Sequence, residues 1–78
     1  MKGAQSKTVA DMFPQESAVI SGFSDDLLAN KLLEMGFIPG TAIRFNFTAP
    51  LGDPVCVTVS GLDLSLRVSE ARSITILS

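Results

Sequence analysis

The feature that most restricts the fold of this sequence is the alternation of apolar and polar residues in short segments. The alternation is clearest over residues 41–49, and it recurs over 55–59, 62–68 and 74–76. Successive side chains of a β-strand point to opposite faces, so a period of two predicts half-buried antiparallel strands. Pro and Gly residues separate these segments, because neither residue sustains the middle of a strand. With residues 18–23, which read as a first strand, the pattern predicts five short strands.

Only one segment has a convincing helical pattern, at about residues 25–35. Ser24 suits the N-cap, and Gly36 suits the C-terminal stop. A single helix cannot supply the crossovers of a parallel sheet. We therefore expect a mainly β protein, a small SH3-like β-barrel of about five antiparallel strands, with the helix inserted after the first strand. Closure of the barrel would remove exposed strand edges.

The length of the chain, 78 residues, predicts one domain over 1–78, in which the polar residues 1–7 are expected to be flexible. A domain of this size must bury most of its apolar side chains, which make up 46% of the residues. Phe37, Phe45 and Phe47 are expected in that core. Little apolar surface is left to line a ligand pocket, so we expect a protein that is not an enzyme.

The charge balance argues against two classes of partner. Six basic and eight acidic residues give a net charge of −2, whereas a nucleic-acid-binding protein normally has a basic face. No stretch approaches the roughly 20 apolar residues of a membrane span. The first residues lack the apolar run of a signal peptide, and a single cysteine suits a reducing compartment. We therefore expect a cytoplasmic protein that binds no nucleic acid and does not insert into membranes.

The sequence has no clear set of metal ligands. It contains no histidine, and Cys56 is its only cysteine, so no Cys-x-x-Cys pair exists. Cys56 also lacks a histidine that would activate it as a nucleophile. The glycines at 36 and 40 lack the Lys-Ser/Thr ending of a phosphate-binding loop. We therefore expect no cofactor, no catalytic residue and no dedicated metal site.

A surface for another protein is the remaining reading, and the best candidate is the proline-stiffened loop at 50–54. This candidate contact loop consists of Pro50, Leu51, Gly52, Asp53 and Pro54. A rigid loop with an apolar tip binds with little ordering cost. The alternative is that the leucine tucks against the helix in an ordinary hairpin connection.

A second candidate surface is the outer face of the helix. Lys31 and Glu34 lie opposite its apolar stripe, and Leu27 falls on the same polar side. Leu27 is interpreted either as a partner contact or as a side chain that folds back onto Phe23. Self-association of the domain also stays open, because its strands are apolar and its edges could pair.

Three stretches of the sequence resemble one known family. They are Leu32–Thr41 (LLEMGFIPGT), Ala49–Val55 (APLGDPV) and Leu64–Arg67 with the following Glu70-Ala71. In this order they are similar to the ferrous iron transport protein A family (FeoA), over about residues 17–76. The resemblance implies an SH3-like barrel with a helical insertion. It also implies a small cytoplasmic component of bacterial ferrous iron uptake, which would regulate the membrane transporter, ferrous iron transport protein B, by contact with it and its GTP-binding domain.

The resemblance leaves other functions open. The protein could be an iron chaperone or sensor that uses carboxylates with Cys56, and a weak or transient contact with Fe²⁺ stays open. It could instead be a GTPase-activating partner that supplies Arg44, Arg67 or Arg72, although these arginines fall in or beside expected strands. A repressor-like domain is the least supported alternative. Iron-dependent repressors carry the same barrel, but this chain has no DNA-binding segment.

Overall fold

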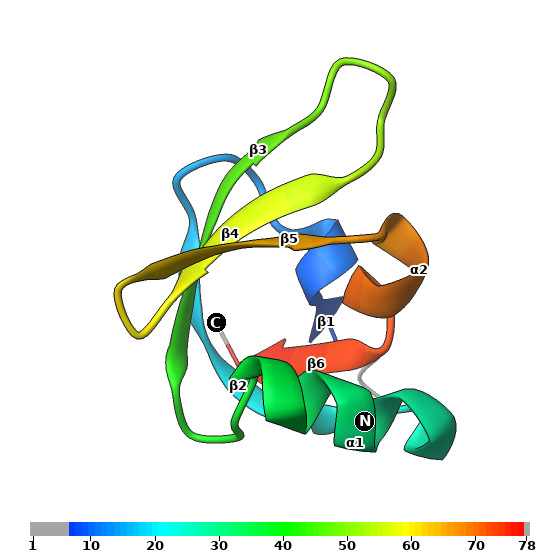
Figure 1. Ribbon diagram of the computed structural model, residues 1–78. Coiled ribbons are helices and arrows are strands. Elements are labelled where there is room, and N and C mark those ends of the chain that lie inside the picture. The colour runs from blue at the N-terminus through cyan, green and yellow to red at the C-terminus, as the bar shows by residue number, and fades with distance from the viewer. Residues whose placement is uncertain (1–6, 78) are drawn as a thin grey trace, which may run out of the picture.

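The computed structural model describes residues 7–77, which form one antiparallel sheet with two helices. Figure 1 shows the sheet curling into a barrel-like shape, with α1 across one end. The elements in chain order are β1 (Lys7–Thr8), the 3-10 helix η1 (Val9–Asp11), β2 (Ser17–Phe23), α1 (Asp26–Met35), β3 (Ala42–Thr48), β4 (Val55–Val59), β5 (Leu62–Leu66), α2 (Val68–Ala71) and β6 (Ile74–Leu77). The expected strand–helix–strand order is confirmed.

The strands follow the order β1-β6-β2-β3-β4-β5, so β1 and β5 are the two edges of the sheet. The sequence predicted about five strands, and the sixth is β1, which spans only two residues and pairs with β6. Two residues are too few to produce a visible alternation, so the pattern missed this strand. The expectation of a loose segment at 1–7 falls on residues 1–6 outside the described part of the chain, while Lys7 lies in β1.

The core lies inside the curled sheet and under α1. Its largest fully buried side chains are Phe37, Ile20, Leu32, Ile43, Leu66, Ile74, Val9 and Val57. Alternate residues of β3 and β4 point inward, as the period of two predicted. Phe37 and Phe45 are buried as expected. The helix places only Leu32 fully inside, while Leu28 and Met35 pack at the core boundary.

Phe47 corrects the predicted core, because its side chain is 55% exposed. The pairing of β3 with β4 slips between Phe45 and Phe47, so that Phe45 lies opposite Val57 and Phe47 opposite Cys56. Such a β-bulge inserts one extra residue and reverses the alternation beyond it. Phe47 therefore joins Cys56 on the outer face of the sheet instead of following Phe45 into the core.

The start of α1 also differs from the prediction. The N-cap is Asp25, not Ser24, and its carboxylate accepts hydrogen bonds from the amides of Leu27 (2.8 Å) and Leu28 (3.3 Å). The amide of Ser24 instead donates to the carbonyl of Ser73, which ties this residue to the chain before β6. A carboxylate at this position satisfies two free helix amides and complements the helix dipole.

The end of α1 agrees with the prediction. Gly36 adopts a left-handed conformation with φ of 111°, and its amide donates to the carbonyls of Leu32 and Leu33. A residue with a Cβ atom is strained in this conformation, so glycine is the natural stop signal for the helix.

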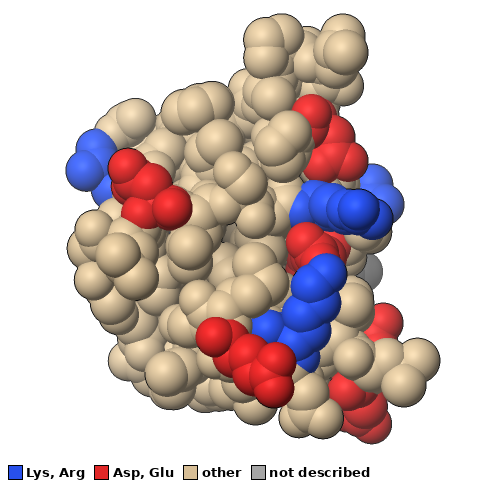
Figure 2. Space-filling view, viewed as in Figure 1, with Lys and Arg blue, Asp and Glu red and all other residues tan. Residues whose placement is uncertain are grey.

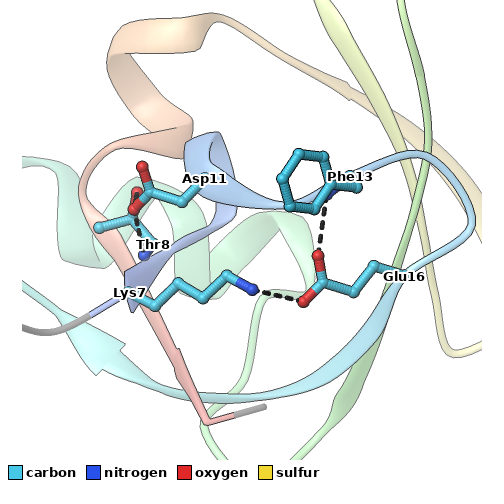
Figure 3. Close-up of polar contacts among 5 residues, drawn as sticks. All are labelled: Lys7, Thr8, Asp11, Phe13 and Glu16. Atoms are coloured by element: carbon cyan, nitrogen blue, oxygen red, sulfur yellow. Dashed lines mark hydrogen bonds and ion pairs between the residues drawn. The ribbon is translucent and has the colours of Figure 1, made fainter.

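The segment before β2 is held in place by a carboxylate, as Figure 3 shows. One oxygen of Glu16 accepts a hydrogen bond from the Lys7 ammonium group at 2.5 Å, and the other accepts from the amide of Phe13 at 2.8 Å. These bonds, with the Lys7 bond as the largest cause, hold the pKa of Glu16 below its ordinary value. The clasp positions Val9 and Met12, which enter the core from η1 and the residue after it.

In residues 7–77, neither helix is long and apolar enough to span a membrane.

Candidate functional site

The candidate contact loop at 50–54 joins β3 to β4 and projects from the top of the barrel in Figure 1. Leu51 lies at its tip with 97% of its side chain exposed, so it does not tuck against α1. Two backbone hydrogen bonds fix the base and the turn: the Ala49 amide donates to the Pro54 carbonyl, and the Gly52 amide donates to the Ala49 carbonyl. The loop therefore presents an apolar side chain on a backbone that is already ordered.

Asp53 ties this loop to α2. Its carboxylate accepts a hydrogen bond from the amide of Val68, at 3.1 Å, which is the first residue of α2. The first amides of a helix lack partners within the helix, so a neighbouring carboxylate satisfies one of them. Asp53 thus acts within the structure as well as at the exposed surface, and it sets the position of the loop relative to α2.

Glu70 of α2 ties this short helix to α1. One of its carboxylate oxygens accepts from the Lys31 ammonium group at 2.6 Å, and the other accepts from the amide of Arg67 at 3.0 Å. The Glu70 side chain is only 8% exposed, whereas that of Lys31 is 58% exposed. The Lys31 bond first, and the Arg67 amide second, hold the pKa of Glu70 below its ordinary value, against the opposing effect of burial. The carboxylate is therefore charged at neutral pH and joins the two helices.

An open polar hollow of about 470 Å³ lies between the start of α1 and α2. It is lined by Ser24, Asp25, Asp26, Ser69, Arg72 and Ser73. A hydrogen bond of 2.8 Å from the Ser24 amide to the Ser73 carbonyl connects the two sides of the hollow. The hollow is too open to enclose a ligand, and its polar lining suits contact with a charged surface of another molecule.

Together, the 50–54 loop, α2 and α1 form one continuous surface, which we call the helix–loop face. Figure 2 shows charged side chains of both signs gathered along the right side of the view, where Figure 1 places α2 and the N-terminal half of α1. The two exposed leucines, Leu51 and Leu27, mark its ends, and Leu27 is 91% exposed. Leu27 thus lies in solvent and does not fold back onto Phe23.

The predicted contact residues fall into two groups that do not meet. The loop residues lie at the top of Figure 1, and Leu27, Lys31 and Glu34 lie on α1 at the bottom. What joins the groups is α2, which is bonded to the loop through Asp53 and to α1 through Lys31. Its Glu70 is the link that sequence reasoning did not assign. The available signal was a glutamate three residues after Arg67, the spacing at which a side chain reaches back to cap a helix start.

The three candidate arginines lie in different surroundings. Arg44 lies on the outer side of β3 and donates a hydrogen bond to the Gln15 side chain. Arg67 and Arg72 are the residues that flank α2, and both are exposed. Arg72 also lines the polar hollow. Two of the three arginines therefore lie on the helix–loop face rather than within strands.

Cys56 lies on β4, where its thiol is 3.9 Å from the Ser65 hydroxyl group on the neighbouring strand. Within residues 7–77, no three His, Cys, Asp or Glu side chains come together in a way that could hold a metal ion.

Comparison with known protein families gives one match over almost the whole chain. The family model described as the FeoA domain matches residues 7–77. This range includes all three sequence stretches that carried the resemblance.

Solved structures agree with this match. A FeoA-like protein from Clostridium acetobutylicum is 28% identical with a TM-score of 0.84, over 94% of this chain and 86% of that one. FeoA of Stenotrophomonas maltophilia, solved in complex with zinc and described as a prokaryotic SH3 domain protein, is 29% identical with a TM-score of 0.76. That match covers 90% of this chain and 88% of the other.

The same fold occurs within a larger protein. A manganese-dependent transcriptional repressor, solved in complex with manganese, matches with a TM-score of 0.84 at 12% identity. The match covers 96% of this chain and 37% of the repressor. At this identity the likeness is one of fold, which is mainly β and SH3-like as the alternation predicted.

Proposed function

The chain belongs to the FeoA domain family, and on that premise we propose that it regulates a bacterial ferrous iron transporter by direct contact. The partner in this proposal is ferrous iron transport protein B, a membrane protein with a cytoplasmic GTP-binding domain. The chain would act on the cytoplasmic side as an accessory protein and not as an enzyme. The family is linked to ferrous iron transport.

The observation that carries the proposal is the exposure of Leu51 on an ordered loop. A leucine that is 97% exposed contributes nothing to the core, yet the loop beneath it is fixed by backbone bonds and by the Asp53 link to α2. Binding through such a loop requires little loss of conformational entropy. Pro50 and Pro54 restrict the same backbone further. Leu27, Lys31 and Glu34 would extend the contact along α1.

The test is an NMR titration of the ¹⁵N-labelled protein with the GTP-binding domain of the transporter, in its GDP and GTP-analogue states. We expect nucleotide-dependent shifts at Leu51, Gly52 and the outer face of α1. Leu51→Asp should weaken binding, because it places a charge where an apolar contact forms. The matched control is Ile38→Asp, a similar change at a half-exposed position on the connection between α1 and β3. Absence of shifts in both nucleotide states would reject this domain as the direct partner.

A second candidate function follows from the position of Arg72. This arginine is exposed and lines the hollow of the helix–loop face, where it could approach a nucleotide held by the partner. An arginine supplied to a GTP-binding site stabilises the charge that develops during hydrolysis, and lysine replaces it poorly. In this case Arg72→Lys should abolish stimulation of GTP hydrolysis by the partner domain, while Arg44→Lys on the outer side of β3 should leave it unchanged. Equal rates for both variants would count against this function.

The iron-binding alternative makes a different prediction. A chaperone or sensor would bind Fe²⁺ stoichiometrically by itself, and anaerobic calorimetry with ferrous iron would detect the heat. If no heat of Fe²⁺ binding is detected, regulation of the transporter by direct contact is the better supported function.

A further inference from the structure

The feature that leads beyond the proposed function is the free edge of β5. This strand pairs with β4 on one side and is the last strand of the sheet, and no backbone hydrogen bond within residues 7–77 reaches its other side. Exposed edges usually carry lysine, proline or a bulge that prevents further pairing. Residues 62–66 contain one charged residue, Asp63, and no lysine or proline, and the pairing of β5 with β4 runs without a register shift.

The hairpin before β5 determines which backbone groups point to this edge. Ser60 and Gly61 form a two-residue turn between β4 and β5, and both have positive φ, 53° and 80°. In such a hairpin the residues that flank the turn, Val59 and Leu62, exchange two backbone hydrogen bonds. Hydrogen-bonded and non-hydrogen-bonded pairs then alternate along the two strands. Leu62, Leu64 and Leu66 therefore bond to β4. The amide and carbonyl groups of Asp63 and Ser65 point to the free edge.

We propose that this edge pairs with the same edge of a second copy of the chain. The antiparallel register is centred on Leu64, so that Asp63 of each copy lies opposite Ser65 of the other. Asp63 and Ser65 are the two residues whose backbone groups face the edge, and this register gives four hydrogen bonds that satisfy all of those groups in both copies.

The next possible register is less favourable. Centring the pair on Ser65 would place Asp63 opposite Arg67. However, the Arg67 amide already donates to Glu70, and its carbonyl already accepts from the Ala71 amide. That register would leave the backbone groups of Asp63 without partners, whereas the register centred on Leu64 requires nothing from Arg67.

The side chains also suit a second copy. Asp63 and Ser65 share the outer face of the sheet, and Arg67, which follows the end of β5, is exposed. Asp63 of one copy would lie diagonally to Arg67 of the other, within reach of a long side chain. On the inner face, the 62% exposed Leu62 would lie opposite Leu66 of the second copy and diagonal to its Leu64. Two opposite-charge contacts and two covered leucines thus accompany the four backbone bonds.

The register makes an unusual prediction for position 65. Ser65 is exposed and lies opposite Cys56 within its own chain, between the oppositely charged Asp63 and Arg67 two positions to either side, so Glu and Lys should be tolerated about equally by the monomer. In the dimer, residue 65 of each copy lies opposite Asp63 of the other, so one substitution changes two contacts. Ser65→Glu should therefore weaken the dimer about tenfold, and Ser65→Lys should strengthen it by a similar factor. If any charge at the edge simply prevented pairing, both variants would form a weaker dimer. That result would contradict the proposed register.

The experiment is sedimentation velocity of the full chain and both variants between about 10 μM and 1 mM, the range in which a weak contact becomes populated. Amide exchange followed by NMR over the same range provides the second readout. The Asp63 and Ser65 amides should become protected as concentration rises, while those of Leu62 and Leu64 should be protected throughout. A monomer at every concentration would overturn the proposal, as would a dimer in which the Asp63 and Ser65 amides stay unprotected. None of these results depends on the transporter, so they leave the proposed function to its own test.

Discussion

At the scale of single residues, the most consequential side chain is that of Glu70. It is nearly buried, and each of its carboxylate oxygens accepts a hydrogen bond, one from Lys31 and one from the Arg67 amide. A buried carboxylate is tolerated when its charge is matched in this way, and loss of the charge leaves the donors without a partner. Glu70 therefore couples the stability of the helix–loop face to its own ionisation.

We expect Glu70→Gln to lower the free energy of unfolding at neutral pH by about 1–2 kcal/mol, because a charged acceptor is lost. The pKa of Glu70 is lowered in the folded protein, so its contribution is present above the pKa of the unfolded chain and disappears as pH falls through the folded value. Stability of the unmodified protein should therefore decrease below about pH 4.3.

Urea unfolding at several pH values measures both effects. Glu16 has a lowered pKa too and contributes to the same acid decline, so the informative quantity is the difference between the protein and Glu70→Gln. The control is Glu34→Gln, an exposed glutamate on α1. If the free energy of unfolding fell with pH equally in Glu70→Gln and in the unmodified protein, the assigned role of this carboxylate would be wrong.

The exposure of Leu51 makes a second prediction at this scale. Leu51→Asp should change the free energy of unfolding by less than about 0.5 kcal/mol, since a fully exposed side chain has no packing to lose. In contrast, Leu32→Ala should lower it by about 2–5 kcal/mol, because Leu32 is fully buried. Thermal and urea unfolding of both variants would show the contrast, and a large loss for Leu51→Asp would place this leucine in the core.

At the scale of elements, α1 is held by one fully buried side chain and by the caps at its two ends. Only Leu32 is fully buried, and Leu33 is 39% exposed. The helix begins at a carboxylate that bonds two amides, and it ends at a glycine in the left-handed conformation. Capping interactions of this kind matter most in helices that bury little surface.

We expect Asp25→Ala to lower the free energy of unfolding by about 1 kcal/mol, since the two helix amides lose their acceptor. Ser24→Ala should have little effect, because Ser24 contributes its backbone amide rather than its side chain. Denaturant unfolding of the two variants distinguishes the adjacent positions. The opposite ranking would restore Ser24 as the N-cap.

The sequence predicted most helices and strands correctly, but it did not predict the β-bulge in β3 or the N-cap of α1. Alternation predicted β3, β4, β5 and β6 because a period of two persists over several residues. It could not predict the bulge that turns Phe47 outward, because the extra residue is chosen by the pairing with β4 and leaves no mark in the sequence of β3. The choice of Asp25 over Ser24 likewise depends on a bond to Ser73, far along the chain.

At the scale of the whole molecule, the barrel is completed on one side by the N-terminal segment rather than by a long strand. The pair of residues in β1 joins the sheet beside β6, and η1 brings Val9 into the core. Sequence reasoning left open whether Leu51 and Leu27 are exposed, and the structure places both in solvent. The connection of the contact loop to α1 through α2 was not predicted, because Asp53, Glu70 and Lys31 are brought together only by the folded chain.

We expect Val9→Ala to lower the free energy of unfolding by about 2 kcal/mol, from lost burial and the cavity that remains. Phe13→Ala removes a larger side chain from the same segment, but that side chain is 72% exposed, so its effect should be smaller. Chemical unfolding of both variants would check this. A larger effect for Phe13→Ala would show that the segment stabilises the protein in another way.

The place of β6 in the sheet has a consequence for how the protein is made. This last strand in sequence lies between the first two, β1 and β2, and it is the partner that joins β1 to the sheet. A ribosome releases β2, β3, β4 and β5 before β6, so the early strands must wait with unpaired edges while synthesis continues. The β4–β5 hairpin can form locally in that interval, whereas the nascent chain acquires its complete core only when β6 has left the exit tunnel.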